Sequence, residues 1–305
     1  MSALRSLILA VANRSAMRRI VTGGLGRRVA MRFVAGEDIE DALKAVKVLN
    51  ERGMTASIDY LGENITDAPT AQAATEVYRA VIERVEAAGI RANLSAKLTQ
   101  MGLDIDEEFA LGNAAVVAAR ASEAGETLTL DMEDHRYTDR TLDTALRLAH
   151  RYPERIGVAV QTYLYRTPDD VERLNQARVR IRLCKGAYRE PKKISYQRKD
   201  DVDAAFARLL VRVLEGNVYP MIATHDERLV TFALRQIEIL GRPRDTFEFQ
   251  MLLGVRRDLQ EMLVAGGYRV RVYVPFGSEW YPYFMRRLAE RPANIKFFLR
   301  QLVRG

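Results

Sequence analysis

The sequence predicts an α/β protein, built as one (β/α)8 barrel with an N-terminal helical extension. Three observations lead to this fold class. Eight short strand-like runs alternate with helical stretches, a chain of 305 residues is long enough for one barrel, and several of the runs are polar on one face. The same alternation also allows a doubly wound open sheet, which is the alternative architecture.

The expected strands are short runs rich in apolar and β-branched residues. They span residues 55–61, 91–97, 127–133, 156–163, 179–185, 219–224, 246–252 and 268–275. The stretches around and between them have the apolar periodicity of helices. These span residues 38–51, 70–88, 107–124, 139–151, 169–176, 200–214, 227–239, 256–265 and 281–290. Strict alternation of strand and helix predicts that the sheet is parallel.

Residues 1–52 stand outside this repeat. We expect them to form a helical arm that packs on the barrel, and we expect the barrel to span residues 53–305. No Gly/Ser linker or low-complexity segment divides the chain, which argues against a second independent domain.

The basic excess of the chain lies at its N-terminus. Residues 1–32 contain seven Arg and no Asp or Glu, whereas the rest balances at 40 basic and 40 acidic residues. This placement predicts no nucleic-acid partner for the main body. The segment fits a transit peptide, an amphipathic helix on an anionic membrane surface, or an ordinary packed helix.

The absence of a run long enough for a transmembrane helix and the single cysteine favour a cytoplasmic location. No run approaches the length of a transmembrane helix, and the single Cys184 excludes a disulfide framework. The alternative suggested by the basic segment is a peripheral position at the inner face of the cytoplasmic membrane.

Polar residues at the ends of the expected strands form the candidate site. Alternate strand residues point into the lumen of a barrel, and barrel enzymes work at the C-terminal ends of the strands. Those ends carry Asp59, Glu63, Lys97, Asp131, Gln161, Arg182, Lys185, Thr224, His225, Gln250 and Tyr273. Buried cations are costly without partners, so the cations of this set predict anionic ligands.

A cluster on the last helical stretch adds two more cations. Tyr283, Arg286, Arg287 and Glu290 share adjoining faces of one helix, at spacings of three and four residues. Two guanidiniums beside an aromatic ring suit a small carboxylate. The alternative is a solvated helix with an Arg286–Glu290 surface pair.

Other chemistries find less support in the sequence. The three histidines lack metal-ligand spacing, and no nucleophile elbow accompanies a Ser or Cys. A turn of small residues, Lys185-Gly186-Ala187-Tyr188, follows a strand directly. Backbone amides in such a turn can approach a phosphate, to which Lys185 adds charge.

Several segments together resemble the proline dehydrogenases. The segments are RLCKGAY at 182–188, YFMRRLAE at 283–290, LGE at 61–63, ATH at 223–225 and FEFQML at 247–252. The resemblance covers the chain from about residue 40 onward and matches the short monofunctional bacterial form. It implies a distorted (β/α)8 barrel that binds FAD non-covalently. It also implies oxidation of L-proline to Δ1-pyrroline-5-carboxylate, with electrons passed to a membrane quinone.

The resemblance also assigns roles to individual residues. Those assigned to proline are Lys97, Arg286 and Arg287 at the carboxylate, Tyr273 and Tyr283 against the ring, Leu183 beneath it, and Glu63 as a gate that pairs with Arg286. Asp131 would orient the cations, and Arg182 would sit by the reactive flavin nitrogen. Those assigned to the cofactor are Met132, Gln161, Arg182, Lys185, Gly186, Ala187, Tyr188, Thr224, His225 and Glu290.

One position departs from the pattern of the proline dehydrogenases. Arg189 stands where some relatives carry a Trp near the flavin, whereas the retained Tyr283 favours proline over hydroxyproline.

Two other functions stay open. A Schiff-base aldolase with Lys97 as nucleophile explains a strand-end lysine but not the tyrosines. A non-enzymatic membrane or nucleic-acid binder explains residues 1–32 alone.

Overall fold

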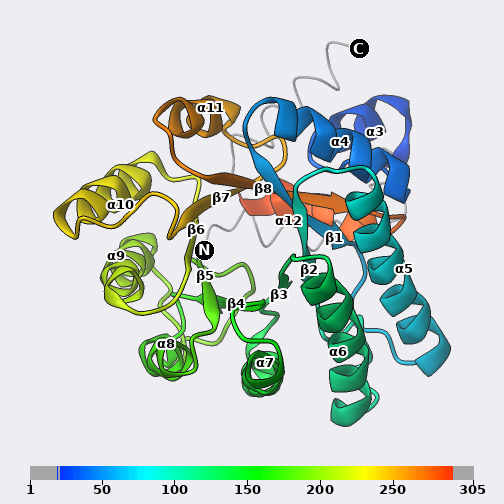
Figure 1. Ribbon diagram of the computed structural model, residues 1–305, viewed down its shortest axis with the longest axis horizontal. Helices are drawn as coiled ribbons and strands as arrows, with labels where there is room; N and C mark the ends of the chain where they lie inside the picture. The colour runs from blue at the N-terminus through cyan, green and yellow to red at the C-terminus, as the bar shows by residue number, and fades with distance from the viewer. Residues whose placement is uncertain (1–18, 20, 291–305) are drawn as a thin grey trace.

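The computed structural model describes residues 19 and 21–290 as a closed, all-parallel barrel surrounded by helices (Figure 1). The strands are β1 (Thr55–Tyr60), β2 (Ala92–Ala96), β3 (Leu128–Leu130), β4 (Ile156–Gln161), β5 (Arg180–Cys184), β6 (Pro220–Ala223), β7 (Glu248–Leu252) and β8 (Val270–Phe276). Pairing runs in sequence order, and β1 closes the barrel on β8 from Thr55↔Arg271 to Tyr60↔Phe276. The barrel prediction is therefore confirmed, and the open sheet is excluded.

Helices lie between consecutive strands, as the alternation predicted, and others precede β1 or follow β8. They are α3 (Gly24–Ala30), α4 (Ile39–Glu51), α5 (Ala68–Ala87), α6 (Glu107–Glu123), η1 (His135–Tyr137), α7 (Thr138–Arg151), α8 (Thr167–Gln176), α9 (Lys199–Glu215), α10 (Glu227–Ile239), α11 (Arg257–Ala265) and α12 (Trp280–Glu290).

Capping residues set several helix starts. Helix α5 begins two residues earlier than expected, because the Asp67 side chain accepts a hydrogen bond from the Thr70 amide and Pro69 occupies the first turn. Strand β3 is shorter than expected, since only Leu128–Leu130 pair with both neighbouring strands.

The two faces of each strand meet different surroundings. On β1, Ile58 is fully buried in the apolar layer between barrel and helices. Ser57 and Asp59 instead point into the lumen, where they contact Arg182 and Lys97. The polar lumen expected from the alternation is thus present.

Helix α4 occupies a place in the outer ring. Figure 1 shows it between α11 and α5, and it packs on β1 and β8. Its buried residues Ala42, Val46 and Leu49 belong to the main core. A helix that precedes β1 thereby covers the seam where the barrel closes. The division of the chain at residue 52 stays a proposal.

Helix α12 leaves the ring and lies across the C-terminal end of the barrel (Figure 1). A second apolar cluster joins Trp280, Phe284 and Met285 of α12 to Val29 of α3 and to Phe33. The rings of Phe33 and Phe284 are 6.0 Å apart. Packing against the α3 segment therefore holds α12 over the strand ends.

The segment after α3 passes very close to the β7–α11 loop. A Cβ at Gly254, whose φ is 73°, would stand 2.0 Å from the carbonyl oxygen of Arg32. Only glycine fits this backbone approach. The loop thereby helps fix the chain that leads from α3 to α4.

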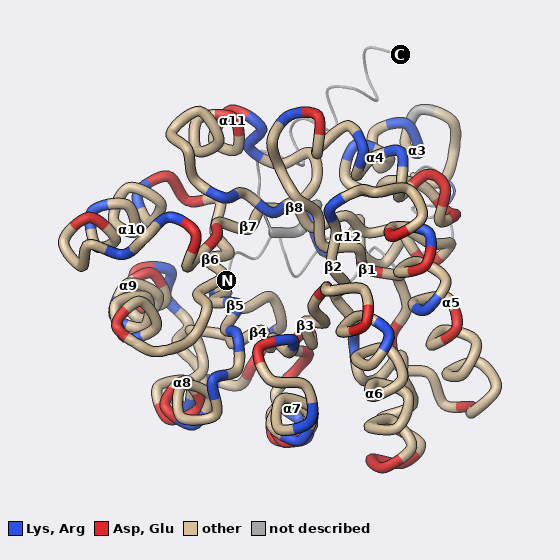
Figure 2. The backbone as a smooth tube through the Cα atoms, in the orientation of Figure 1, with Lys and Arg blue, Asp and Glu red and all other residues tan. Residues whose placement is uncertain are grey.

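Acidic and basic residues are interspersed along the ring of helices (Figure 2). Within residues 19 and 21–290, no helix combines the length and the hydropathy that crossing a bilayer requires.

We predict that Phe284→Ala releases α12 from the barrel end. Deleting a buried Phe side chain costs about 3–5 kcal/mol, and Phe284 is 1% exposed. Amide exchange over 280–287 should therefore accelerate by roughly 100-fold or more, while exchange in β2 stays unchanged. Hydrogen-exchange mass spectrometry measures both segments.

The exposed Met262 of α11 offers a control, and Met262→Ala should leave exchange in α12 unchanged. Uniform acceleration across the whole barrel in Phe284→Ala would contradict a local role for this packing.

Candidate active site

The candidate site begins with an ion cluster at the C-terminal ends of β1, β2 and β3. The Lys97 Nζ donates to both carboxylate oxygens of Asp59 at 3.1 Å and lies 3.6 Å from Asp131 Oδ2. Lys97 is 7% exposed and Asp59 is fully buried. The strand register places these groups together, because Asp59 pairs with Ser95, two residues before Lys97.

Burial and charge act against each other in this cluster. Burial raises the pKa of Asp59 to about 6, against the opposing influence of Lys97. Burial disfavours the lysine cation, but Asp59 and Asp131 outweigh it and raise the pKa of Lys97. Burial likewise opposes the Asp131 anion, yet Arg182 and Lys97 hold its pKa below the usual range. Lys97 therefore remains an ammonium group.

Arg182 lies in the lumen below this cluster and donates hydrogen bonds in three directions. Its Nη1 donates to Asp131 at 2.5 Å and to Ser95 Oγ at 2.7 Å, and its Nε donates to Gln250 Oε1 at 2.6 Å. Its guanidinium carbon also lies 5.6 Å from the centre of the Tyr273 ring. The side chain is thereby fixed on the barrel axis, and the β5 residue Leu183 must point the opposite way.

Aromatic and basic residues close the site from above. Tyr273 donates its hydroxyl to Asp131 Oδ2 at 2.6 Å. On α12, the Arg287 guanidinium lies 5.4 Å from the centre of the Tyr283 ring. Arg286 donates to Glu63 Oε1 at 2.7 Å, and both side chains are 26% exposed. The pairing expected for Glu63 and Arg286 is thus present, whereas the gating role stays a prediction.

Residues expected near a cofactor line the ends of β3, β4, β5 and β6. Gln161 donates from Nε2 to the Glu133 carbonyl at 2.9 Å, and its Oε1 accepts from Tyr163 and from the Ala187 amide. His225 Nε2 accepts from the Leu252 amide at 2.8 Å. Met132, Thr224 and Gln161 are each 4–7% exposed.

The β5 turn has the form that a closely approached backbone needs. Gly186 has a φ of 113°, and a Cβ there would stand 2.4 Å from the Tyr163 ring. Lys185 is 28% exposed and donates to Asp203 at 2.5 Å and to Asp226 at 3.1 Å. The turn brings backbone amides and a lysine side chain together, and a phosphate bound there would share Lys185 with Asp203 and Asp226. Tyr188 follows as a largely buried ring.

One predicted contact is not favoured by the structure, and one lies outside it. Leu183 is 1% exposed and belongs to the apolar layer beneath the helices, on the face of β5 away from Arg182. It is therefore poorly placed to lie beneath a ring in the lumen. The side chain of Glu290 lies outside the described residues.

Several residues of the site were not singled out from sequence. Ser57 and Ser95 bond Arg182, and Thr99 bonds a buried carboxylate of Glu133 at 2.6 Å. Leu252 lies on the lumen face of β7 and pairs in register with Tyr273. Strand alternation places Ser57, Ser95 and Leu252 on the lumen face, but it does not show which side chains meet across the barrel.

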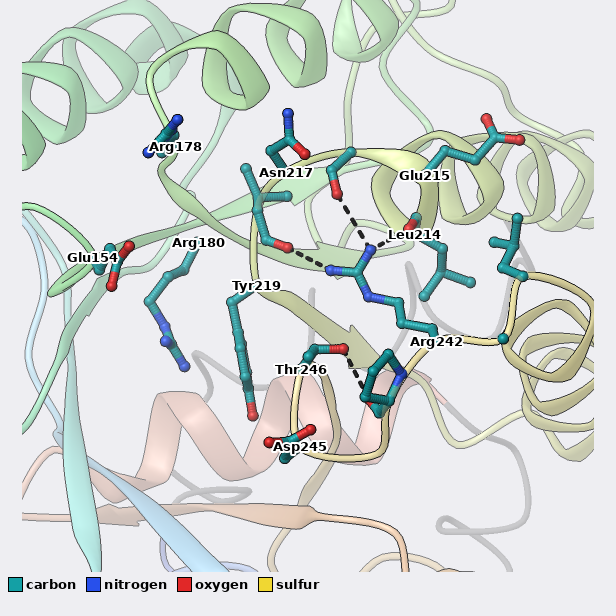
Figure 3. A pocket seen from close by; sticks show the side chains of 15 residues that line it. Glu154, Arg178, Arg180, Leu214, Glu215, Asn217, Tyr219, Arg242, Asp245 and Thr246 are labelled. Carbon is teal, nitrogen blue, oxygen red and sulfur yellow. Dashed lines mark hydrogen bonds between the residues drawn. The ribbon is translucent and has the colours of Figure 1, made fainter.

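A cavity of about 730 Å³ opens at the opposite, N-terminal end of the strands (Figure 3). Arg242 donates to the carbonyls of Leu214, Gly216 and Val218 there and so fixes the chain between α9 and β6. The Arg180 guanidinium lies 3.8 Å from the centre of the Tyr219 ring. In barrels this end serves stability, so we assign this cavity no part in the chemistry.

No group of His, Cys, Asp and Glu within residues 19 and 21–290 is arranged to hold a metal ion. The chemistry that the described site offers consists of binding a carboxylate between cations, excluding water beneath α12, and placing a guanidinium beside a reacting centre.

Comparisons with known proteins agree with this geometry. Residues 42–300 match the family model described as proline dehydrogenase. The chain is 42% identical to "Proline dehydrogenase" of Deinococcus radiodurans over 99% of this chain and 98% of the relative. It is 37% identical to "Proline dehydrogenase 1" of Bacillus subtilis (strain 168), with 99% of each chain covered.

A solved structure shares the fold. The proline utilization A (PutA) from Bdellovibrio bacteriovorus inactivated by N-propargylglycine superposes with a TM-score of 0.83. The two are 24% identical, and the match covers 94% of this chain and 36% of the other.

We predict that Glu133→Gln changes the pH dependence of stability. Burial raises the folded-state pKa of Glu133 to about 7, from an ordinary value of 4.5. The protonated carboxyl therefore favours the folded state; this contribution is complete below pH 4.5 and is lost as the pH rises to about 7. The free energy of unfolding should fall across this range by roughly 2–3 kcal/mol more in the parent chain than in the variant.

Urea unfolding at a series of pH values, followed by circular dichroism, measures this difference. Parallel stability curves for the two proteins would show that Glu133 does not titrate in this way.

Proposed function

Because the chain belongs to the proline dehydrogenase family, we propose that the site beneath α12 binds and oxidises proline through the residues described above. The chain is an enzyme that oxidises proline to Δ1-pyrroline-5-carboxylate, and its family is flavin-dependent. The observation that carries the residue assignments is the Lys97–Asp131–Arg182–Tyr273 network beneath Arg286 and Arg287.

The proline carboxylate is proposed to bind Arg286, Arg287 and Lys97. Lys97 is suited to this because its raised pKa keeps it cationic beside two carboxylates. Arg286 is paired with Glu63 in this structure, and this pair is the proposed gate. With substrate bound, the pair would close over it and exclude water.

The pyrrolidine ring is proposed to lie between Tyr273 and Tyr283. Tyr273 is held by Asp131 and comes from β8, whereas Tyr283 comes from α12. Leu252, beside Tyr273 on the lumen face, supplies an apolar contact that we assign in place of Leu183.

We assign FAD as the flavin. When bound, it would accept the hydride that leaves the ring carbon next to nitrogen, while the nitrogen loses a proton. Lys185, Gly186, Ala187 and Tyr188 would hold it along the β5 turn, whose tight backbone fits phosphate. The other residues assigned to it are Met132, Gln161, Thr224, His225 and Glu290.

Arg182 is proposed to stabilise negative charge that develops beside it on the barrel axis. Asp131, Ser95 and Gln250 fix its guanidinium before any substrate binds, so little reorganisation is needed. Asp131 also holds Tyr273 and Lys97, and so orients three groups of the site.

A Schiff-base aldolase is disfavoured by the same geometry. A nucleophilic lysine must be neutral, which requires a lowered pKa. The two carboxylates instead raise the pKa of Lys97.

We further propose that electrons pass to a membrane quinone, from a cytoplasmic enzyme that contacts the membrane peripherally. The seven Arg of residues 1–32, without Asp or Glu, support this proposal, although residues 1–18 lie outside the described part. Quinone reduction in anionic vesicles, compared before and after deletion of residues 1–18, tests it.

We predict that Arg286→Met weakens proline binding while the flavin stays bound. Losing a charge-assisted contact of this kind costs about 2 kcal/mol or more, which corresponds to roughly 30-fold in affinity. Spectral titration of the yellow protein with proline measures the dissociation constant. Arg173→Met, on the outer face of α8, is the control and should bind proline normally. An unchanged affinity in Arg286→Met would refute the carboxylate contact.

We predict that Arg182→Met slows flavin reduction by roughly 100-fold, since it removes a fixed charge beside the reacting centre. Proline affinity should fall much less. Stopped-flow bleaching of the flavin by proline separates the two constants. Equal losses in the rate of flavin reduction and in proline affinity would show that Arg182 has a structural role only. A colourless protein that proline leaves unchanged would refute the assignment of flavin chemistry altogether.

A further inference from the structure

A row of buried hydrogen bonds continues from Arg182 down the barrel axis. Arg182 Nε donates to Gln250 Oε1 at 2.6 Å, and Gln250 Nε2 donates to Glu248 Oε1 at 2.6 Å. The three side chains are 2–4% exposed. Glu248 and Gln250 are alternate residues of β7, so both face the lumen.

Chemistry allows the Gln250 amide one orientation. A guanidinium carries only donors, and an ionised carboxylate only accepts. The amide oxygen must therefore face Arg182, and the amide nitrogen must face Glu248. Burial opposes ionisation of Glu248, but Arg271 outweighs it and holds the pKa of that carboxyl below its usual range. Glu248 is thus an acceptor that keeps the amide from turning.

Glu248 is itself fixed from below. Arg271 donates from Nε to Glu248 Oε1 at 2.8 Å and from Nη1 to the Ala56 carbonyl at 2.8 Å. Tyr219 donates its hydroxyl to Glu248 Oε2 at 3.4 Å. Further charged groups near this end are Arg180, stacked on Tyr219 at the cavity of Figure 3, Arg269, which also bonds Tyr219, and Glu126.

The contact with Gln250 decides how the Arg182 guanidinium lies. The Nη1 edge is held by Asp131 and Ser95, both on the β2–β3 side, whereas Gln250 holds Nε from β7. Ser57 adds only a longer contact of 3.3 Å to Nη2. Anchors on different sides of the barrel fix the guanidinium plane, and without Gln250 the longer Ser57 contact is left to oppose rotation about the Nη1 edge.

We propose that Gln250, oriented by Glu248, is the positioning residue that sets the Arg182 guanidinium in its working plane. This inference rests on the proposed role of Arg182 beside the flavin and extends it to two residues that need not touch proline.

The central experiment replaces Gln250 with Leu, which keeps the approximate volume and removes the acceptor. We expect flavin reduction to slow by roughly tenfold or more, because the fixed charge is no longer aligned, while the proline dissociation constant stays within about threefold. The midpoint potential of the bound flavin, measured without proline, should fall. A reduction rate within twofold of the parent value and an unchanged potential would overturn the proposal.

Gln260→Leu is the matched control. Gln260 is another buried glutamine, 3% exposed, whose side-chain amide donates to the carbonyls of Leu252 and Val255. It should lower the thermal unfolding temperature as Gln250→Leu does, but leave the flavin potential unchanged. An equal fall in potential in both variants would assign the effect to general loss of packing and overturn the proposal.

Gln250→Glu tests the acceptor directly. Residue 250 would then share a proton with Glu248, because adjoining carboxyls raise one pKa. The protonated form donates to Glu248 and accepts from Arg182, as the amide does. We expect the reduction rate relative to the parent to recover at low pH and to fall as pH rises. A reduction rate in Gln250→Glu that stays low at every pH would overturn the role of Gln250. A reduction rate that recovers equally at every pH would overturn the role of Glu248.

Two further variants keep the outcome decisive. If Gln250→Leu does not fold, Gln250→Met replaces it: the thioether keeps the length of the side chain but is only a weak acceptor, so the rate and potential should fall, and parent values would overturn the proposal. If Arg182→Met reduces its flavin at the parent rate, the proposed role of Arg182 is refuted, and the positioning role with it. If Arg182→Met is slow but Gln250→Leu reduces its flavin at the parent rate, the positioning role alone is refuted.

Discussion

The structure depends on the compensation of buried cations inside the barrel. Lys97, Arg182 and Arg271 lie along the axis, and Asp59, Asp131 and Glu248 accept their hydrogen bonds. Isolated charges in such a place would be strongly destabilising, whereas paired and hydrogen-bonded ones are tolerated. The arrangement does little for stability compared with an apolar lumen, and its use is to hold donors in fixed directions. The polar faces of β1, β2, β5, β7 and β8 all follow from this requirement.

Helix α12 converts the charged barrel end into a pocket. It carries Tyr283, Arg286 and Arg287, yet its apolar residues belong to a cluster with Phe33 and Val29 that is separate from the main core. Its place in the ring is taken by α4. The substrate-facing wall and the catalytic floor therefore belong to different packing units, which meet at Leu61, at Tyr273 and at the Glu63–Arg286 bond. Two such units can separate to admit a ligand without disturbing the barrel.

Much of the fold and part of the candidate site could be predicted from sequence, because these features depend on local sequence patterns. The alternation of strand and helix gave the barrel, because each element shows its own period. The polar alternation located Lys97, Asp131 and Arg182 in the lumen, and the same alternation places Leu183 outside it, against the contact that the resemblance implied. Pairings across the barrel were beyond sequence, since Gln250 meets Arg182 over 68 residues of separation. The position of α4 in the outer ring of helices was also not predicted, because it depends on contacts with β8.

The use of α4 at the barrel seam has a consequence for biosynthesis. Its apolar residues Ala42, Val46 and Leu49 are made early, but β8, against which they pack, ends at Phe276. During translation this helix emerges long before its partner strand, so its apolar face has no native cover on that side. The barrel cannot close until nearly the whole chain has left the ribosome. A nascent chain of this protein is thus expected to rely on transient cover, such as a chaperone, for the segment that later seals the seam.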